Sequence, residues 1–117
     1  MKVLEALEVA HRAIEAASEK LASDILLLDT RGVCGFADYF VILTGESERQ
    51  LDAIAEEIGH SLKGSGVYPL HIEGTPGSGW LLLDYNDVVI HIFSPEERQS
   101  YALDQLWANA PTVLRIQ

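Results

Sequence analysis

The stretch Gly79–Phe93 constrains the fold more than any other part of the chain. It contains two apolar runs, Trp80–Leu83 and Val88–Phe93, separated by four residues that are typical of turns. β-Branched and aromatic runs bounded by turn residues predict a β-hairpin. Within the connection, Asn86 is the residue that best tolerates a positive φ. Both runs are almost continuously apolar, whereas a strand covered on one face alternates strictly. Both faces of the hairpin therefore need cover.

We assign one face of this hairpin to the core and the other to a partner protein. Alternation along the first strand places on one face Trp80, Leu82 and Asp84, and on the other Leu81, Leu83 and Tyr85. A tryptophan beside leucines is by default a core residue, but the glycine-rich approach to Trp80 puts it at a strand start near the surface. Tryptophan and tyrosine are also frequent at the energetic centres of interfaces. We expect Trp80 to contact a partner, with burial in the core as the alternative.

The rest of the chain predicts a mixed α/β fold. Helical periodicity runs from Val3 to Leu21 and from Ser47 to Gly64, and a third helix is predicted to begin at Ser94 and to end at Ala110-Pro111. The strands predicted outside the hairpin are Asp24–Asp29, Asp38–Thr44 and Val67–Glu73. Five strands and three helices in 117 residues predict a single domain over residues 1–117. We expect a mixed five-stranded sheet with helices mainly on one face and the other face open.

Local signals set the expected ends of these elements. Ser47 followed by Gln50 forms a capping box, and Ser94 followed by Pro95 is a second helix start. Pro69 predicts that its strand is short or near a sheet edge, because proline cannot donate to a ladder. Residues 112–117 are interpreted as a tail. The apolar stripe of the first helix is rich in alanine, which favours close packing on a sheet over a coiled-coil seam.

Charge and cysteine content exclude several functional classes. Eight lysines and arginines against 18 aspartates and glutamates give a formal net charge of −10. Tight binding to nucleic acid needs clustered cations, so we expect no direct reading of nucleic acid. An acidic surface favours basic partners, or simply keeps the protein solvated. The single Cys34 indicates a reducing compartment. No signal peptide or bilayer-length apolar run is present, so we expect a cytoplasmic protein without membrane contact.

The sequence offers no convergent set of catalytic or metal-binding residues. The four histidines lack metal-ligand spacing, and no phosphate-loop or nucleophile-elbow motif occurs. We therefore expect no catalytic residue, no metal and no cofactor. One enzyme hypothesis stays open. The strand-to-helix junction at residues 44–47 could present backbone N–H groups to a phosphate, as in nucleotidyltransferases. Such enzymes carry paired aspartates on the next strand, and here Asp84 and Asp87 flank a turn that they could simply cap.

Several segments match a known family pattern in order and spacing over about residues 4–110. They are Asp38–Ile42, Thr44–Gln50, Glu73-Gly74, Gly79–Tyr85, Asp87–Phe93, Arg98, Tyr101–Leu103 and Leu106-Trp107. Together they resemble the bacterial ribosomal silencing factors, relatives of the plant Iojap protein. The resemblance implies a nucleotidyltransferase-like fold without catalytic aspartates. It also implies binding to the large ribosomal subunit through its ribosomal protein fourteen. Such binding blocks joining of the small subunit and represses translation when nutrients are short.

The same resemblance implies that the hairpin is the contact surface. The implied apolar or amphipathic contacts are Trp80, Leu82 and Tyr85, and the implied acidic contacts, which orient basic groups of the partner, are Glu73, Asp84 and Asp87. Two departures from the family pattern are Asn86 in place of glycine and Ser100 in place of an aromatic residue. Two alternatives to silencing stay open beside the enzyme. They are a role in large-subunit assembly, which organellar relatives serve, and a homodimer formed through the open sheet face.

Overall fold

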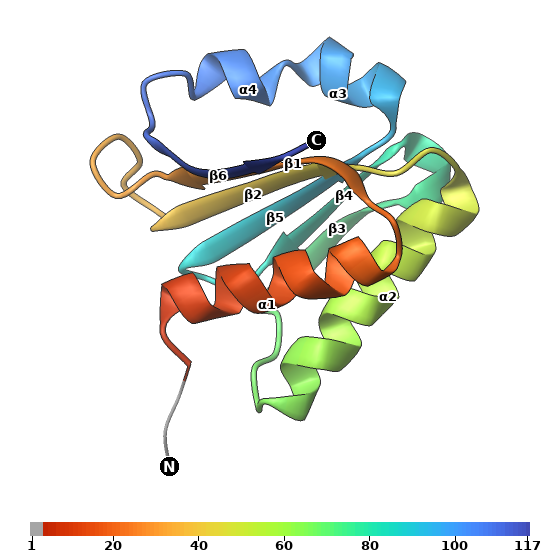
Figure 1. Cartoon of the computed structure of the whole chain (residues 1–117), viewed down its shortest axis with the longest axis horizontal. Coiled ribbons are helices and arrows are strands. Elements are labelled where there is room, and N and C mark those ends of the chain that lie inside the picture. The colour runs from red at the N-terminus through yellow and green to blue at the C-terminus, as the bar shows by residue number, and fades with distance from the viewer. Residues whose placement is uncertain (1–3) are drawn as a thin grey trace.

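The computed structural model describes residues 4–117 as one six-stranded sheet between two helical layers (Figure 1). The strand order across the sheet is β3-β4-β5-β2-β1-β6. The elements, in chain order, are α1 (Ala6–Glu19), β1 (Ser23–Asp29), β2 (Tyr39–Thr44), α2 (Glu48–Gly64), β3 (His71–Thr75), the 3-10 turn η1 (Pro76–Ser78), β4 (Trp80–Asp84), β5 (Val88–Phe93), α3 (Pro95–Tyr101), α4 (Leu103–Leu106) and β6 (Thr112–Ile116).

The sheet is mixed, as predicted, but it has six strands and not five. Strands β2 and β5 run parallel at its centre and are buried along their whole length, while all other neighbouring pairs are antiparallel. The sixth strand is β6, which the sequence analysis interpreted as a tail. It pairs with β1, with Leu114 opposite Leu27. A five-residue segment carries little periodic signal of its own, and its partner lies at the far end of the chain.

The edge strand β3 begins later than predicted. The sequence analysis placed this strand at Val67–Glu73, whereas the ladder with β4 starts at His71 and continues to Thr75. Proline has no N–H group to donate, so the ladder forms only after Pro69. The expectation of a short edge strand is confirmed, and all five residues of β3 are exposed.

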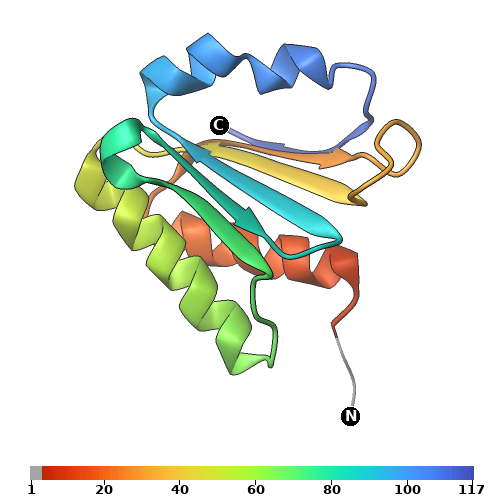
Figure 2. The ribbon, with the colours of Figure 1, turned by 180° about the vertical axis from the view of Figure 1, so that it is seen from behind.

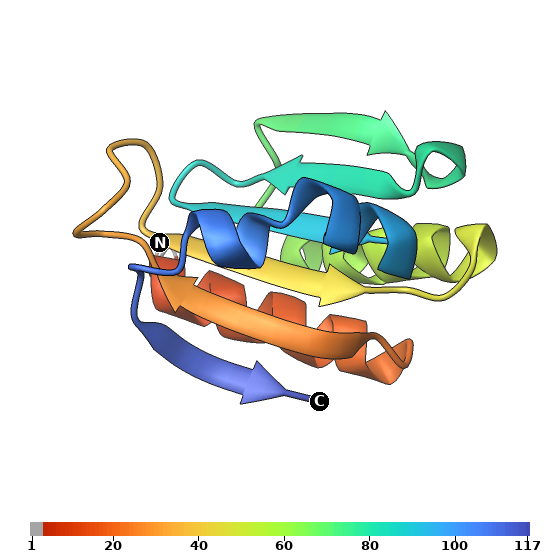
Figure 3. The ribbon, with the colours of Figure 1, turned by 90° about the horizontal axis from the view of Figure 1, so that it is seen from above.

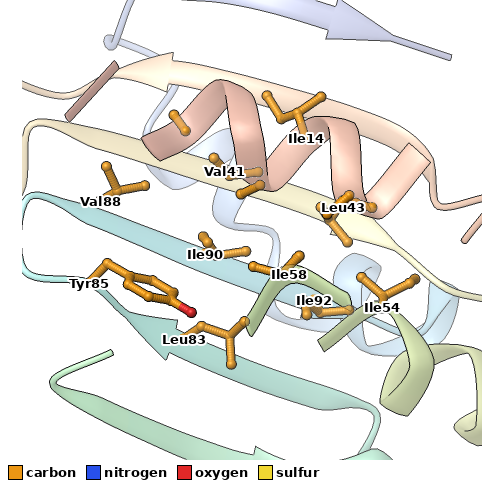
Figure 4. Packing of buried hydrophobic residues seen from close by; sticks show 14 of the residues in the cluster. Ile14, Val41, Leu43, Ile54, Ile58, Leu83, Tyr85, Val88, Ile90 and Ile92 are labelled. Atoms are coloured by element: carbon orange, nitrogen blue, oxygen red, sulfur yellow. The ribbon is translucent and has the colours of Figure 1, made fainter. Parts of the chain in front are cut away.

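One face of the sheet is covered by α1 and α2 (Figure 4). Ala10, Ala13 and Ala17 are fully buried, because small side chains let α1 approach the sheet and α2 closely. This packing confirms the prediction that the alanine-rich stripe of the first helix packs on a sheet and not in a coiled-coil seam. Two members of the predicted stripe, Leu7 and Leu21, are exposed, and a third, Val3, lies outside the described residues.

The other face is not open along its whole width, which corrects the predicted placement of helices mainly on one face. Helices α3 and α4 cross this face above β5 and β2, as seen from both sides and from above (Figures 1, 2 and 3). They cover a second, smaller core, whose buried members are Leu26, Leu28, Ala37, Phe40, Ile42, Val89, Phe93 and Ala110. The view from above shows that they leave β3 and much of β4 uncovered on this side (Figure 3). The open face therefore exists over the β3–β4 edge, and β6 at the opposite edge is also uncovered on this side (Figure 3).

The helix starts follow the predicted caps, but the last helix is interrupted. Ser47 Oγ accepts a hydrogen bond from the Gln50 backbone N–H (3.1 Å), and Ser94 Oγ accepts one from Glu97 (3.2 Å). A single helix from Ser94 to Ala110-Pro111 was expected. The chain instead leaves the helix at Ala102, whose φ of 52° separates α3 from α4. No glycine marks this position, so sequence signals gave no reason to expect a break.

Candidate functional site

The register of the hairpin brings four of the predicted contact residues onto one face of the sheet edge. Glu73 lies directly opposite Leu82 across the β3–β4 ladder, and Trp80, Leu82 and Asp84 alternate along β4. Residues opposite each other in an antiparallel pair point to the same side. We call the patch formed by Glu73, Trp80, Leu82 and Asp84 the β3–β4 surface. Glu73 is exposed, and the three β4 residues are partly buried.

Trp80 is neither sealed in the core nor free on the surface. Its ring stacks over His91 and Phe93 at centroid distances of 6.3 Å each, and Tyr101 of α3 lies 5.2 Å away. Its indole Nε1–H donates a hydrogen bond to His91 Nδ1 (3.3 Å). One side of the indole thus packs on the second core, and part of the ring reaches solvent. Trp80 has the half-buried, fixed geometry of an aromatic anchor.

His91 packs against the Trp80 ring as a neutral side chain. It is 6% exposed, and the rings of Phe40, Trp80 and Phe93 surround it. Burial among these rings disfavours the imidazolium and lowers the pKa of His91 to about 4. Since Nδ1 accepts the indole proton, the ring proton resides on Nε2.

The structure separates Tyr85 from the β3–β4 surface, which corrects its assignment as a partner contact. Tyr85 points to the α1–α2 side, where it packs with Leu83 and Val88 in the main core (Figure 4). It is 9% exposed, and this burial raises the pKa of its phenol. Alternation requires this outcome, because Tyr85 and Trp80 are five residues apart and so face opposite sides.

The two turn aspartates have different surroundings. Asn86 adopts the expected positive φ of 74°, and its N–H donates to Asp84 Oδ1 (2.8 Å), so Asp84 caps the turn. The Asp87 carbonyl accepts hydrogen bonds from the backbone N–H groups of Asp38 and Tyr39 (2.8 and 3.1 Å). Its side chain is exposed beyond the turn, at the opposite end of the hairpin from Trp80. Asp87 is therefore not part of the β3–β4 surface.

The charge on this side of the sheet is negative. Strands β3, β4 and β5 contain no lysine or arginine, and the one basic side chain of α3, Arg98, is buried in ion pairs. Among residues 4–117, the carboxylate of Glu73 pairs only with His71 (2.6 Å). A partly apolar patch with acidic neighbours can take a basic partner that also presents apolar groups.

Sequence reasoning missed one aromatic residue at this site. Tyr101, at the end of α3, is 50% exposed and packs against both Trp80 and Phe93. Its helix lies over the sheet only because the chain turns back after β5, so no hydrophobic pattern in the sequence indicated the contact. The family resemblance included this tyrosine in a motif without giving it a role.

At the strand-to-helix junction, the first two backbone N–H groups after Thr44 already have acceptors within the chain. The Gly45 N–H donates to the Phe93 carbonyl, and the Glu46 N–H donates to Gln50 Oε1 (2.9 and 2.6 Å). Within residues 4–117, no group of three or more histidine, cysteine or acidic side chains is placed to hold a metal ion. No helix in this same range is long and apolar enough to cross a membrane.

Comparison with known proteins identifies the family. The family model described as "Ribosomal silencing factor during starvation" matches residues 3–117. The chain belongs to the ribosomal silencing factor family. It is 42% identical over 99 residues to the ribosomal silencing factor of Bacillus subtilis, covering 85% of this chain and 84% of that one. It is 38% identical over 106 residues to the factor of Halalkalibacterium halodurans, covering 91% of each chain.

A solved structure and a mammalian relative extend this family match. The crystal structure of a Chromobacterium violaceum protein superposes with a TM-score of 0.86 at 34% identity, covering 90% of this chain and 88% of that one. The mouse protein named "Mitochondrial assembly of ribosomal large subunit protein 1" is 35% identical over 89 residues, which are 74% of this chain and 39% of the mouse protein. The mixed α/β fold and the family predicted from the sequence are both confirmed.

Proposed function

We propose that this protein binds the large ribosomal subunit through its ribosomal protein fourteen and blocks joining of the small subunit. Translation would thereby slow when nutrients are limited. The family description names silencing during starvation, and the mouse relative is named for assembly of the large subunit. The observation that carries the proposal is the partly open, acid-fringed β3–β4 surface.

The chemistry of this surface fits a basic ribosomal protein. Trp80 and Leu82 supply apolar contact area, and Glu73 and Asp84 supply negative charge beside it. The net charge of −10 favours approach to a cationic partner, mainly through the association rate. A stable contact needs about 1,200–2,000 Å² of buried surface, so neighbouring elements must contribute as well. Once bound at the subunit interface, the protein acts by steric exclusion and needs no catalysis.

Subunit joining is the direct test. Purified large subunits are incubated with this protein, small subunits are added, and joined ribosomes are separated on sucrose gradients. We expect a dose-dependent loss of joined ribosomes that Trp80→Ala weakens. The matched control is Tyr68→Ala, because Tyr68 is also an exposed aromatic residue (61%) but lies in the loop between α2 and β3 and is not a member of the β3–β4 surface. Equal inhibition by Trp80→Ala and the unsubstituted protein would remove the β3–β4 surface from the mechanism.

Assembly of the large subunit is the second candidate, and the name of the mouse relative favours it. A purified system of mature subunits distinguishes a block of subunit joining from a role in assembly, because it contains no assembly intermediates. A protein that acts only in assembly leaves the joining of mature subunits unchanged. A homodimer through the same surface is the remaining alternative. Sedimentation equilibrium at increasing concentration detects it, and Leu82→Glu should dissociate such a dimer.

A further inference from the structure

A buried arginine joins the helical layer formed by α3 and α4 to one end of the sheet. Arg98 on α3 is 8% exposed. Its Nη1 donates to Thr44 Oγ1 (2.9 Å) at the end of β2 and to the carbonyl of Asp24 at the start of β1. Its Nε and Nη2 donate to the two carboxylate oxygens of Asp104 (3.3 and 2.8 Å). The planar guanidinium thus joins α3 to both strands and to α4.

The contacts of Arg98 bridge the break between the two helices. Ala102 holds a left-handed conformation (φ 52°, ψ 40°), which costs a non-glycine residue about 1–2 kcal/mol. The turn at Ala102 brings Asp104 back over Arg98. Partial burial acts to raise the pKa of Asp104, but hydrogen bonds and charge from Arg98 outweigh it and hold that pKa below its ordinary value. The ion pair therefore stabilises the strained connection.

Tyr101 follows Arg98 by about one helical turn and lies next to the β3–β4 surface. Its ring is 5.2 Å from that of Trp80 and 5.7 Å from that of Phe93. Half of its surface is open to solvent. Any rotation of α3 about its axis would move this ring away from Trp80. The two aromatic rings form one continuous apolar area only while α3 keeps its present position.

We propose that Tyr101 is a contact residue for the basic ribosomal partner and that Arg98 is the positioning residue that holds Tyr101 against Trp80. This inference rests on the function proposed above and extends the β3–β4 surface onto α3. A basic partner would meet two fixed rings with negative charge nearby, an arrangement suited to a lysine or arginine side chain packed on an aromatic face. Arg98 itself, being buried, does not touch the partner.

The first test measures the affinity of the full chain for salt-washed large ribosomal subunits. We expect Tyr101→Ala to weaken binding by about tenfold or more, as for an interface hot spot. Arg98→Lys keeps the charge but loses the planar fork of donors. We expect it to weaken binding about fivefold, within the range of couplings between neighbouring residues. Tyr68→Ala is the control and should bind like the unsubstituted chain.

The second test asks whether Arg98 acts through Tyr101. If it does, the double variant Arg98→Lys/Tyr101→Ala binds no more weakly than Tyr101→Ala alone, because the ring to be positioned is already absent. Purely additive losses would mean that Arg98 only stabilises the fold, which overturns its positioning role. Wild-type affinity of Tyr101→Ala, with Trp80→Ala still impaired, overturns the inference and leaves the proposed function standing. Failure of the unsubstituted chain to bind overturns both.

A spectroscopic readout keeps the test independent of binding. The chain has two tryptophans, so its ¹H–¹⁵N spectrum contains two indole peaks, and Trp80→Phe assigns them. Removal of the Tyr101 ring changes the ring current at Trp80 and shifts its peak. We expect Arg98→Lys to shift the Trp80 peak in the same direction as Tyr101→Ala. A Trp80 peak unmoved by Arg98→Lys in a folded variant contradicts the positioning role.

Discussion

Acid should destabilise this protein through His91, the neutral histidine beneath Trp80. Burial lowers the pKa of His91 to about 4, whereas an unfolded chain has the ordinary value near 6.5. Between these two values the unfolded chain binds a proton that the folded chain does not. The contribution of His91 is therefore fully present above about pH 6.5 and is lost as the pH falls toward 4.

The size of this effect follows from the difference between the two pKa values. A difference of about 2.5 pH units corresponds to about 3.4 kcal/mol when the transition is complete. The linkage relation gives a loss of about 2 kcal/mol at pH 5 and about 3 kcal/mol at pH 4. A loss of this size is a large share of the stability of a small domain, which is about 5–15 kcal/mol.

Urea unfolding at several pH values between 7 and 4 measures this contribution. The comparison is with His91→Gln, whose amide oxygen can still accept the Trp80 indole proton but does not titrate. Other groups titrate in both proteins, so the difference between the two curves isolates His91. We expect the unsubstituted protein to lose about 2 kcal/mol more than the variant between pH 7 and 5. Parallel curves would refute a buried neutral histidine under Trp80.

Three further outcomes follow from the structure. Tyr85→Ala should lower the free energy of unfolding by about 3–5 kcal/mol, as for other buried aromatic side chains, while the folded fraction binds large subunits normally; urea titration and cosedimentation measure the two effects. Gly79→Ala should destabilise by about 1–3 kcal/mol, because Gly79 has a φ of 80° and a Cβ would lie 2.7 Å from both Ser94 Oγ and Glu97 Cγ; thermal unfolding measures this. The association rate with large subunits should fall about tenfold between low and high salt, because charge steers the encounter; stopped-flow measurements at about 50 mM and about 500 mM salt test it.

The hairpin and the helix caps were predictable because their signals are local. Asn86 takes the positive φ expected of it, and Ser47 and Ser94 cap their helices as expected. The face shared by Trp80, Leu82 and Asp84 follows from alternation alone. The same rule places Tyr85 on the opposite side, so its assignment as a partner contact, taken from the family resemblance, conflicted with the strand geometry.

Strand β6 and the break between α3 and α4 were not predictable, because both involve long-range contacts. Strand β6 pairs with β1, and Arg98, which precedes the break at Ala102, contacts Asp24 and Thr44. These partners are remote in sequence from the segments that they organise. The predicted open face is consequently reduced to the two edges of the sheet, and Tyr101 lies at the border of the β3–β4 edge.

The central claim is that the β3–β4 surface docks on a basic protein of the large subunit. The most direct measurement is titration of isolated ribosomal protein fourteen, free of RNA, with the unsubstituted chain and with Leu82→Glu. Thermal unfolding first establishes that the variant is folded. The account predicts saturable binding by the unsubstituted chain and a loss of about tenfold or more for the variant. Equal affinity of both chains, or no binding by either, contradicts it.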